Sequence, residues 1–331
     1  MNVLLSLSTS ASVKAGVETF SDHLCRALGL HIVDYDRLRA QFPEPFSVIR
    51  QPTEAKRLDH WFADHLAEYD PDVIFTNGMD GWALQTDRPV VNIQHGTFAG
   101  FARAAMRQTD LNYWRTRILY ARYERRSAQR ARQVVANSPF TQRNVRRFYR
   151  LDSAVIPNAV DTEMMRPVPQ AAARKRLGLP AGATIGVFVG RPDYSKGFDV
   201  VRQVAALRPD ILFLCVFPFP YHLEGNFQVR ANIPSRRMKD MYSAADFCIA
   251  PTRFEGFGYA PLEALACNTP VIGNRTGIFL DHDLPGFTPA TDAATYAAAL
   301  PLDRARSRPG LRPFSFSRFR QRYKQLVNSI R

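Results

Sequence analysis

Cysteine is scarce in this 331-residue chain, and long apolar runs are absent. The four cysteines are scattered, with no metal-type spacing: Cys25, Cys215, Cys248 and Cys267. Three lie in apolar stretches, so we expect reduced core thiols in a cytoplasmic protein rather than a disulfide scaffold. No apolar run reaches the ~18–20 residues that span a bilayer. The first eight residues are too short and lack the basic flank of a signal peptide, so we expect a buried first strand there.

Acidic residues are outnumbered, with 30 Asp and Glu against 44 Lys and Arg, which gives a net charge of +14. The excess is concentrated in residues 101–150, where 13 arginines face only Asp110 and Glu124, so this stretch carries 13 − 2 = +11. Such a block predicts an anionic partner, which could be a phospholipid surface, a nucleic acid or a phosphorylated substrate. The length predicts two domains, because a single core rarely grows this large.

Strand and helix patterns alternate along the chain, which is typical of an α/β fold with parallel sheets. A strand at 3–7, a loop with Gly16 and a helix through Phe20 and Leu28 form the first unit of a Rossmann-like domain. In such sheets, ligands bind at the carboxyl ends of the strands. His95 follows the strand at 89–94 and is a candidate ligand contact, although a lone histidine is more often structural.

The stretch 250–274 combines a strand end, two glycines and the start of a helix near Pro261. Gly256 and Gly258 lie where free backbone N–H groups and the positive end of the helix dipole favour an anion. Glu255 and Glu263 stand eight positions apart. They could form a ligand-binding pair, or a helix cap together with a core glutamate that has its own partner.

A second anion seat is predicted after the buried strand at 184–190. Arg191 and Lys196, with Gly190 and Gly197, can neutralise a diphosphate at the strand end. A solvated turn with incidental charges is the alternative.

The helix expected at 115–132 intersperses aromatic and aliphatic side chains, such as Trp114 and Ile118, among arginines. It could be a solvated basic face over an ordinary core stripe. We favour the other interpretation, a membrane-surface helix within an arginine-rich region at 103–150.

The segment from Glu255 to Ile272 closely resembles the Glu-x7-Glu signature of retaining GT-B glycosyltransferases of family 4, the group 1 glycosyl transferases. Residues 190–197 resemble the Gly-Arg-x4-Lys-Gly element of that family, and residues 155–161 its Val-Ile-Pro-Asn-Gly-Val-Asp segment, with Ala159 in place of glycine. The chain departs from the family pattern at Ala15 and at Pro218–Pro220.

The resemblance implies an α/β GT-B fold, in which two Rossmann-like domains face a central cleft and a C-terminal helix crosses back to the N-terminal domain. We expect an acceptor-binding domain at 1–166, a nucleotide-sugar-binding domain at 167–313, and the C-terminal helix at 314–331. Apolar positions spaced along this last stretch fit a buried stripe: Phe316, Phe319, Tyr323, Leu326 and Ile330.

The resemblance also implies roles for individual residues. Glu255 would hold hydroxyls of the donor sugar, Glu263 those of the ribose, and His95 would contact the sugar near the reaction centre. The catalytic set is His95, Arg191, Lys196 and Glu255. The donor-binding set is Gly16, Gly190, Arg191, Lys196, Arg230, Glu255, Gly256, Phe257, Gly258 and Glu263. We expect no metal, since Asp281 and Asp283 lie in a late surface loop, and no cofactor besides a UDP- or GDP-sugar donor.

The predicted function is a retaining, metal-independent transfer of a hexose to a glycan or lipid-linked glycan in cell-surface polysaccharide or glycolipid synthesis. The protein would be cytoplasmic and bind peripherally to the anionic inner membrane face through residues 103–150. One alternative is a GT-B enzyme with a soluble small-molecule or phosphorylated acceptor. A nucleic-acid-binding α/β protein is a more distant one, because no motif of that class is present. The sequence leaves the sugar, the base, the acceptor and the oligomeric state open.

Overall fold

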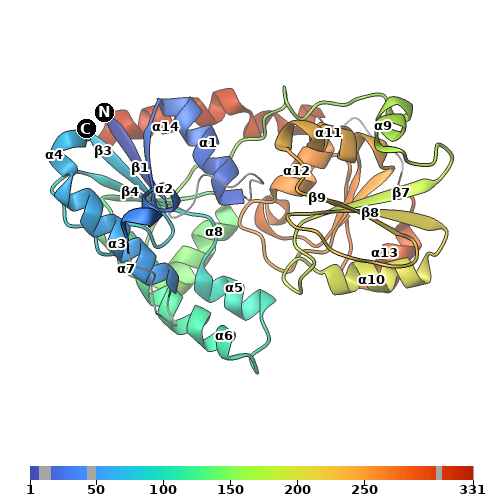
Figure 1. Cartoon of the computed structure of the whole chain (residues 1–331), viewed down its shortest axis with the longest axis horizontal. Helices are drawn as coiled ribbons and strands as arrows, with labels where there is room; N and C mark the ends of the chain where they lie inside the picture. The colour runs from blue at the N-terminus through green and yellow to red at the C-terminus, as the bar shows by residue number, and fades with distance from the viewer. Residues whose placement is uncertain (7–15, 43–49, 303–307, 331) are drawn as a thin grey trace. The chain divides into compact units, whose positions relative to one another are not determined.

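The computed structural model describes residues 1–6, 16–42, 50–302 and 308–330. The chain forms two compact units (Figure 1). The N-terminal unit comprises Met1–Ala159 and Phe316–Arg331, and the C-terminal unit comprises Val160–Ser315. The chain thus passes from one unit to the other between Ala159 and Val160, whereas the sequence pattern predicts a boundary near residue 166.

Six parallel strands form the sheet of the N-terminal unit, in the order β2-β1-β3-β4-β5-β6. They are β1 (Asn2–Ser6), β2 (His31–Asp34), β3 (Val73–Asn77), β4 (Val90–Gln94), β5 (Gln133–Ala136) and β6 (Ala154–Val155). Both faces of this sheet are covered. On β1, Leu4 packs on one face with Phe20, while Val3 and Leu5 pack on the other with Phe62. This explains why the strand is continuously apolar, as parallel strands buried on both faces are.

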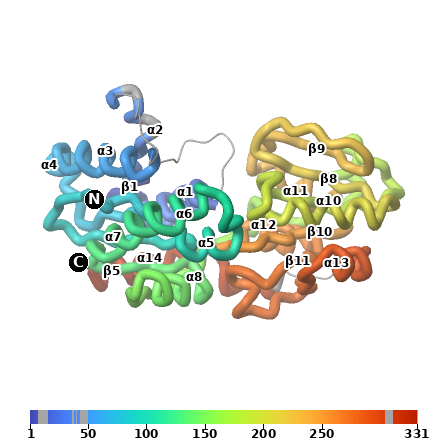
Figure 2. Tube along the Cα trace, turned by 90° about the horizontal axis from the view of Figure 1, so that it is seen from below, coloured from blue at the N-terminus to red at the C-terminus, as the bar shows by residue number. Residues whose placement is uncertain are grey.

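Helices and helical turns cover the N-terminal sheet. They are α1 (Gly16–Leu28), α2 (Tyr35–Leu38), η1 (Arg39–Gln41), α3 (Arg50–Asp64), α4 (Leu66–Tyr69), α5 (Phe98–Ala105), α6 (Leu111–Trp114), η2 (Arg115–Tyr120), α7 (Ala121–Arg130), α8 (Pro139–Asn144), η3 (Val145–Tyr149) and α14 (Phe316–Ile330). The predicted helix at 115–132 begins earlier, at Leu111, and contains the wide π-type turn η2. Figure 2 shows α5, α6 and α7 together on one side of this unit.

The last helix, α14, belongs to the core of the N-terminal unit and lies beside α1 (Figure 1). Phe319 and Tyr323 pack edge-on against Phe20 of α1, with ring centroids 5.9 and 6.1 Å apart. Phe319, Tyr323 and Ile330 are buried, and Phe316 and Leu326 are partly buried against the same cluster. The spacing of apolar residues in the sequence predicts this stripe.

The C-terminal unit has a second six-stranded parallel sheet, in the order β12-β11-β10-β7-β8-β9. Its strands are β7 (Thr184–Val189), β8 (Ile211–Phe217), β9 (Phe227–Ala231), β10 (Phe247–Ala250), β11 (Val271–Gly273) and β12 (Phe287–Pro289). Its helices are α9 (Gln170–Leu177), α10 (Phe198–Leu207), α11 (Ser235–Ala244), α12 (Tyr259–Ala266), η4 (Gly277–Leu280), α13 (Ala293–Ala299) and η5 (Arg308–Phe314). The fold class expected from the sequence, two Rossmann-like units in an α/β protein, is therefore confirmed.

None of the four cysteines, all of which lie in described parts of the chain, forms a disulfide bond. Cys215, Cys248 and Cys267 are buried in the C-terminal core, and Cys25 is partly buried on α1. Among the residues that the structure describes, no helix combines the length and the apolar character needed to cross a bilayer.

Candidate functional site

The strand order of the C-terminal unit reverses between β7 and β10. From β7 the sheet grows through β8 and β9 on one side, and from β10 it grows through β11 and β12 on the other. β7 and β10 are direct parallel neighbours. The loops that follow them leave the same edge of the sheet at this topological switch point, where ligands of open α/β sheets bind. These two loops carry the motif residues predicted from the sequence.

The loop after β7 is held together by Asp193, which is not among the residues predicted from the sequence. Its carboxylate accepts a hydrogen bond from the backbone N–H of Lys196 at 3.0 Å and one from the hydroxyl of Ser195 at 2.6 Å. It also pairs with Arg191 at 2.9 Å. Gly190 has a φ of +151°, a value that favours glycine. The local Asp-x-Ser spacing is the sequence signal that could have revealed this turn.

The structure brings two of the predicted catalytic residues into direct contact. The ammonium group of Lys196 lies 2.5 Å from a carboxylate oxygen of Glu255. The side chains are 27% and 26% exposed, so the pair is partly shielded but open to a ligand. The backbone of Glu255 is fixed by a hydrogen bond, in which its N–H donates to the hydroxyl of Thr276 at 3.1 Å. A cation suited to phosphate and a carboxylate suited to sugar hydroxyls therefore lie side by side.

The loop after β10 ends at Gly258, which precedes α12 and has a φ of +106°. Gly277 packs against the same loop, and a Cβ there would lie 2.6 Å from the carbonyl oxygen of Phe257. Gly256 is buried. The Phe257 side chain is also buried, against Tyr259 and Phe314. Phe257 can therefore offer a ligand only its backbone, and its ring is a core residue.

Glu263 lies in α12 beside the buried Tyr242, whose hydroxyl donates to the carboxylate at 2.8 Å. Burial raises the pKa of Glu263 to about 7. The structure is compatible with both interpretations of Glu263. One carboxylate oxygen has a core partner, as a core glutamate would, while the residue is only partly buried, as a ligand-binding residue would be. Tyr242 was not selected from the sequence, since it lies 21 positions away on α11.

Arg230 lies on the edge strand β9, and its side chain has a structural use. The guanidinium donates to the carbonyl oxygens of Val229 at 3.1 Å and of Leu177, the last residue of α9, at 3.0 Å. It thus satisfies a terminal carbonyl group of that helix. A role of Arg230 in donor binding, which the family resemblance implies, would therefore rest on its backbone.

His95, the candidate of the N-terminal unit, follows β4. Its Nε2 lies 2.9 Å from the Oδ1 of Asn77, at the end of the neighbouring strand β3. The Nδ2 of Asn77 donates in turn to the hydroxyl of Ser21 at 3.2 Å. The ring packs edge-on against Phe20, with centroids 4.6 Å apart. Burial lowers the pKa of His95 to about 4, so the imidazole is neutral at physiological pH. Asn77 is a second polar residue at this edge of the sheet. Its position at the end of an apolar strand is the feature of the sequence that could have identified it as a candidate site residue.

Gly16 is exposed and is the first residue of α1. The residues before it, including Lys14 and Ala15, lie outside the described residues. Asp281 and Asp283 are exposed, and Asp283 pairs with Arg275 at 2.8 Å. In the described part of the chain, no cluster of three or more His, Cys, Asp and Glu side chains could hold a metal ion.

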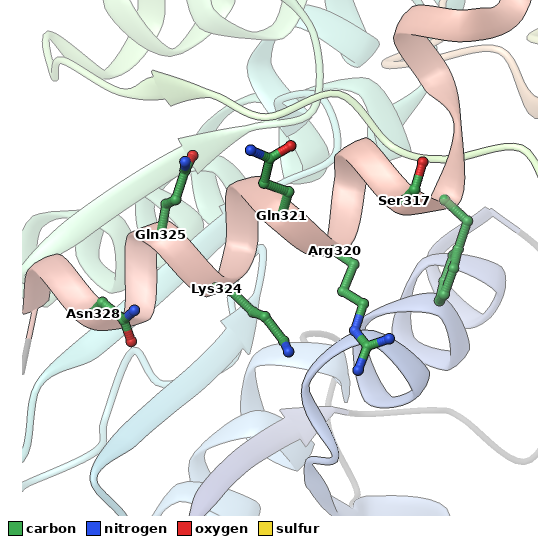
Figure 3. A pocket seen from close by; sticks show the side chains of 7 residues that line it. Ser317, Arg320, Gln321, Lys324, Gln325 and Asn328 are labelled. Atoms are coloured by element: carbon green, nitrogen blue, oxygen red, sulfur yellow. The ribbon is translucent and has the colours of Figure 1, made fainter.

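An open groove runs along α14 in the N-terminal unit (Figure 3). Arg320 and Lys324 project from one side of the helix, and Gln321 and Gln325 from another (Figure 3). The groove is lined by the side chains of a single helix rather than by loops at the carboxyl ends of strands. We therefore place the candidate site at the strand ends.

Known proteins resemble this chain in sequence and in fold. The Glycosyltransferase Family 4 profile matches residues 15–164, and the profile of glycosyl transferases group 1 matches residues 184–301. The chain is 32% identical over 270 residues to a D-inositol 3-phosphate glycosyltransferase of Saccharomonospora viridis, across 72% of this chain and 60% of that protein. The corresponding protein of Thermobispora bispora is 30% identical over 248 residues, across 64% of this chain and 57% of that protein. The matched region thus spans about 60% of the length of these relatives.

Solved structures share the fold over nearly the whole chain. Sucrose-phosphate synthase from Thermosynechococcus elongatus has a TM-score of 0.79 and 21% identity, covering 99% of this chain and 98% of that chain. Anabaena HepE in complex with UDP and glucose has a TM-score of 0.72 and 15% identity, covering 99% of both chains. The two sequence profiles and the identity to the Saccharomonospora viridis protein show that the chain belongs to the glycosyltransferases of family 4 and group 1, and the solved structures show that its fold is GT-B.

Proposed function

We propose that the protein transfers a hexose, with retention of configuration and without a metal, from a UDP- or GDP-sugar to a small phosphorylated acceptor. The proposed donor, a nucleotide-sugar, is inferred from the contact between Lys196 and Glu255 at the switch point. The proposed acceptor is inferred from relatives that are named D-inositol 3-phosphate glycosyltransferase. This was the alternative in the sequence analysis, and these names favour it over a glycan or lipid-linked glycan.

On the donor side, departure of the nucleoside diphosphate is the difficult step, since negative charge develops on the leaving oxygens. Arg191 and Lys196 can stabilise that charge, together with backbone N–H groups around Gly258. Glu255 and Glu263 each offer a carboxylate that can accept two hydrogen bonds from a pair of neighbouring hydroxyls. Glu255 would hold the sugar and Glu263 the ribose.

In the N-terminal unit, the neutral His95 can hydrogen-bond a hydroxyl of the donor sugar without adding charge to the site. Its orientation is fixed by Asn77. The arginines of the N-terminal unit supply the positive field that a phosphorylated acceptor requires. The sequence offers no obvious protein nucleophile, so we infer a front-face transfer. In such a transfer, a donor phosphate oxygen helps to deprotonate the attacking hydroxyl.

Calorimetric titration with UDP and GDP, at low and moderate salt, tests the donor assignment. We expect one nucleotide to bind wild-type protein. Turnover of the matching nucleotide-sugar should then be saturable with inositol phosphate, and vesicles should not be required. Binding of neither nucleotide would contradict the proposed donor class. A steep salt dependence of binding to duplex DNA, without nucleotide binding, would favour the nucleic-acid alternative instead.

A lipid-linked acceptor is the second candidate, and a specific surface favours it. Leu111, Trp114 and Ile118 are 86%, 50% and 55% exposed, and their spacing of three and four places them on one face of the α6–η2 segment. Leu119 is 39% exposed beside them. We call these four side chains the apolar face. The opposite side of the segment is anchored in the core by Tyr113 and Tyr120, both buried.

The surroundings of the apolar face are strongly basic. Exposed arginines precede and follow it along the chain, at Arg103, Arg107, Arg122, Arg125 and Arg126. Glu124, one of the two acidic residues of this region, is buried and faces inward. Apolar side chains among cations are suited to an anionic lipid surface. On this proposal the protein is cytoplasmic and binds the inner membrane face peripherally.

Vesicle sedimentation distinguishes the two candidates. If the apolar face meets lipid, the wild type should bind vesicles of phosphatidylglycerol and phosphatidylcholine, and binding should weaken as salt rises. Arg122→Glu with Arg126→Glu should reduce binding at low salt, because each arginine near the surface contributes about 1 kcal/mol. Trp114→Ala with Ile118→Ala should remove the binding that survives salt. Donor hydrolysis should persist in both variants.

Leu207→Ala is the matched control, since Leu207 is 57% exposed but lies on α10 of the C-terminal unit. It should bind vesicles like the wild type. Absence of wild-type binding at every salt concentration would leave the small phosphorylated acceptor as the only candidate of the two.

A further inference from the structure

The two donor loops of the C-terminal unit interlock at Gly197. This residue caps the start of α10 with a φ of +71°. A Cβ there would lie only 2.1 Å from the carbonyl oxygen of Pro251, in the loop after β10. No side chain fits in that space, so the backbones of the two loops are in close contact.

Arg253 links the same two loops through its backbone and its side chain. Its N–H donates to the carbonyl oxygen of Ser195 at 2.9 Å. Its Nη1 donates to the carbonyl oxygen of Tyr194 at 2.6 Å, and its guanidinium lies 3.7 Å from the centroid of the Tyr194 ring. Ser195 and Tyr194 directly precede Lys196. Arg253 lies two positions before Glu255.

The guanidinium is held from its other side by Asp199, in the first turn of α10. Nη1 and Nη2 donate to the two carboxylate oxygens at 2.7 and 2.8 Å, which is a bidentate pair. The hydrogen bond from Arg253 lowers the pKa of Asp199, and Asp199 raises the pKa of Arg253. Asp199 thus fixes the plane of a side chain that reaches across to the other loop.

We propose that Arg253 is a positioning residue that locks the Lys196 loop to the Glu255 loop, so that the phosphate-binding and sugar-binding groups keep a fixed separation. The inference rests on the proposed donor roles of Lys196 and Glu255. Arg253 acts through these loops and needs no contact with the donor. A lysine could not replace it, because an ammonium group lacks the planar fork that binds Asp199 and stacks on Tyr194.

We call this contact between the two loops through Arg253 the lock. Hydrogen exchange of the ligand-free protein tests the lock without reference to any substrate. In Arg253→Lys and in Asp199→Asn, amides in residues 193–198 should exchange about tenfold faster, because loss of a charge-assisted bidentate pair favours local opening. Arg208→Lys is the matched control. Arg208 also forms a bidentate pair, with Asp210, and donates to the carbonyl oxygens of Ala297 and Leu300, outside the two donor loops. Wild-type exchange of residues 193–198 in both lock variants would overturn the proposal.

Nucleotide affinity supplies a second readout that a general loss of stability would not reproduce. With UDP and GDP as probes, Arg253→Lys should weaken binding of the accepted nucleotide about tenfold. The same substitution in a Lys196→Ala background should have a smaller effect, because the lock acts largely through Lys196. An equal loss in both backgrounds would contradict the proposal. If neither nucleotide binds the wild type, the donor assignment fails, and the exchange experiment still decides the lock.

Discussion

Replacing Lys196 with alanine is expected to lower glycosyl transfer by about a thousandfold, with the fold intact. Removing one group that stabilises developing charge costs on the order of 3–4 kcal/mol in the transition state. Lys196 also offsets the charge of Glu255, 2.5 Å away, so its loss leaves an unpaired carboxylate near the proposed diphosphate position. The fold should persist, because ion pairs that solvent reaches contribute only about 0–1 kcal/mol to stability.

Comparison with Glu255→Gln makes this prediction specific. Both variants should lose transfer, but their effects on the affinity for UDP or GDP should differ. Lys196→Ala should weaken nucleotide binding, since it removes a phosphate partner. Glu255→Gln should maintain or strengthen it, since it frees the ammonium group of Lys196 from its partner. Calorimetry and single-turnover assays measure the two properties separately.

Lys175→Ala is the matched control, since Lys175 is an exposed lysine of the same unit, on α9. It should retain wild-type turnover and nucleotide affinity. Wild-type turnover in Lys196→Ala would show that the phosphate assignment is wrong. A parallel loss of nucleotide affinity in both site variants would mean that Glu255 holds the loop rather than the sugar.

The fold and the two site residues Lys196 and Glu255 could be predicted from the sequence because the patterns that indicate them are local. Buried parallel strands are short apolar runs, and ligand residues follow directly after them. Gly190, Lys196 and Glu255 all stand at such positions, and the order of strands then brings the loops after β7 and β10 together. A sequence motif therefore predicts which residues meet at the edge of the sheet.

The supporting contacts were not accessible, because they join residues far apart in the chain. Arg253 and Asp199 are 54 positions apart. Each looks like an ordinary surface charge in the sequence, and only the packing of the two loops makes them a pair. The same holds for His95 and Asn77, 18 positions apart. The sequence pattern therefore finds the residues that we propose to bind substrate, whereas the residues that orient them are found only from the geometry.

Glu124 shows how misleading a local pattern can be. It stands among Arg122, Arg125 and Arg126, in a stretch that predicts a solvated or membrane-facing helix. In the structure it is only 5% exposed. Its carboxylate accepts a hydrogen bond from the N–H of Phe98 at 2.8 Å and a short one from the hydroxyl of Tyr149. The signal that could have revealed this burial is the core spacing of Glu124 with Tyr120 and Ser127.

Glu124→Ala is therefore expected to lower the free energy of unfolding of the N-terminal unit by about 3–5 kcal/mol. The substitution leaves the N–H of Phe98 and the hydroxyl of Tyr149 without their acceptor and opens a cavity. Urea unfolding followed by tryptophan fluorescence measures this change, since all three tryptophans lie in the N-terminal unit: Trp61, Trp82 and Trp114. Glu68→Gln, at an exposed glutamate of the same unit, should change the free energy by less than about 0.5 kcal/mol.

Glu124→Gln adds a pH test of the same burial. Burial raises the pKa of Glu124 from 4.5 to about 7, so between these values the folded state binds more protons than the unfolded state. The contribution of Glu124 to stability is therefore present below pH 4.5 and falls as the pH rises to 7, by roughly 3 kcal/mol in total. Glutamine resembles the protonated acid and lacks this dependence. Relative to the wild type, Glu124→Gln should thus gain stability between pH 5 and pH 8. Asp59, Glu263 and His95, whose pKa values are also shifted to between about 4 and 7, are common to both proteins and cancel in the difference. A difference that stays constant with pH would show that Glu124 is ionised in the fold and held by its donors.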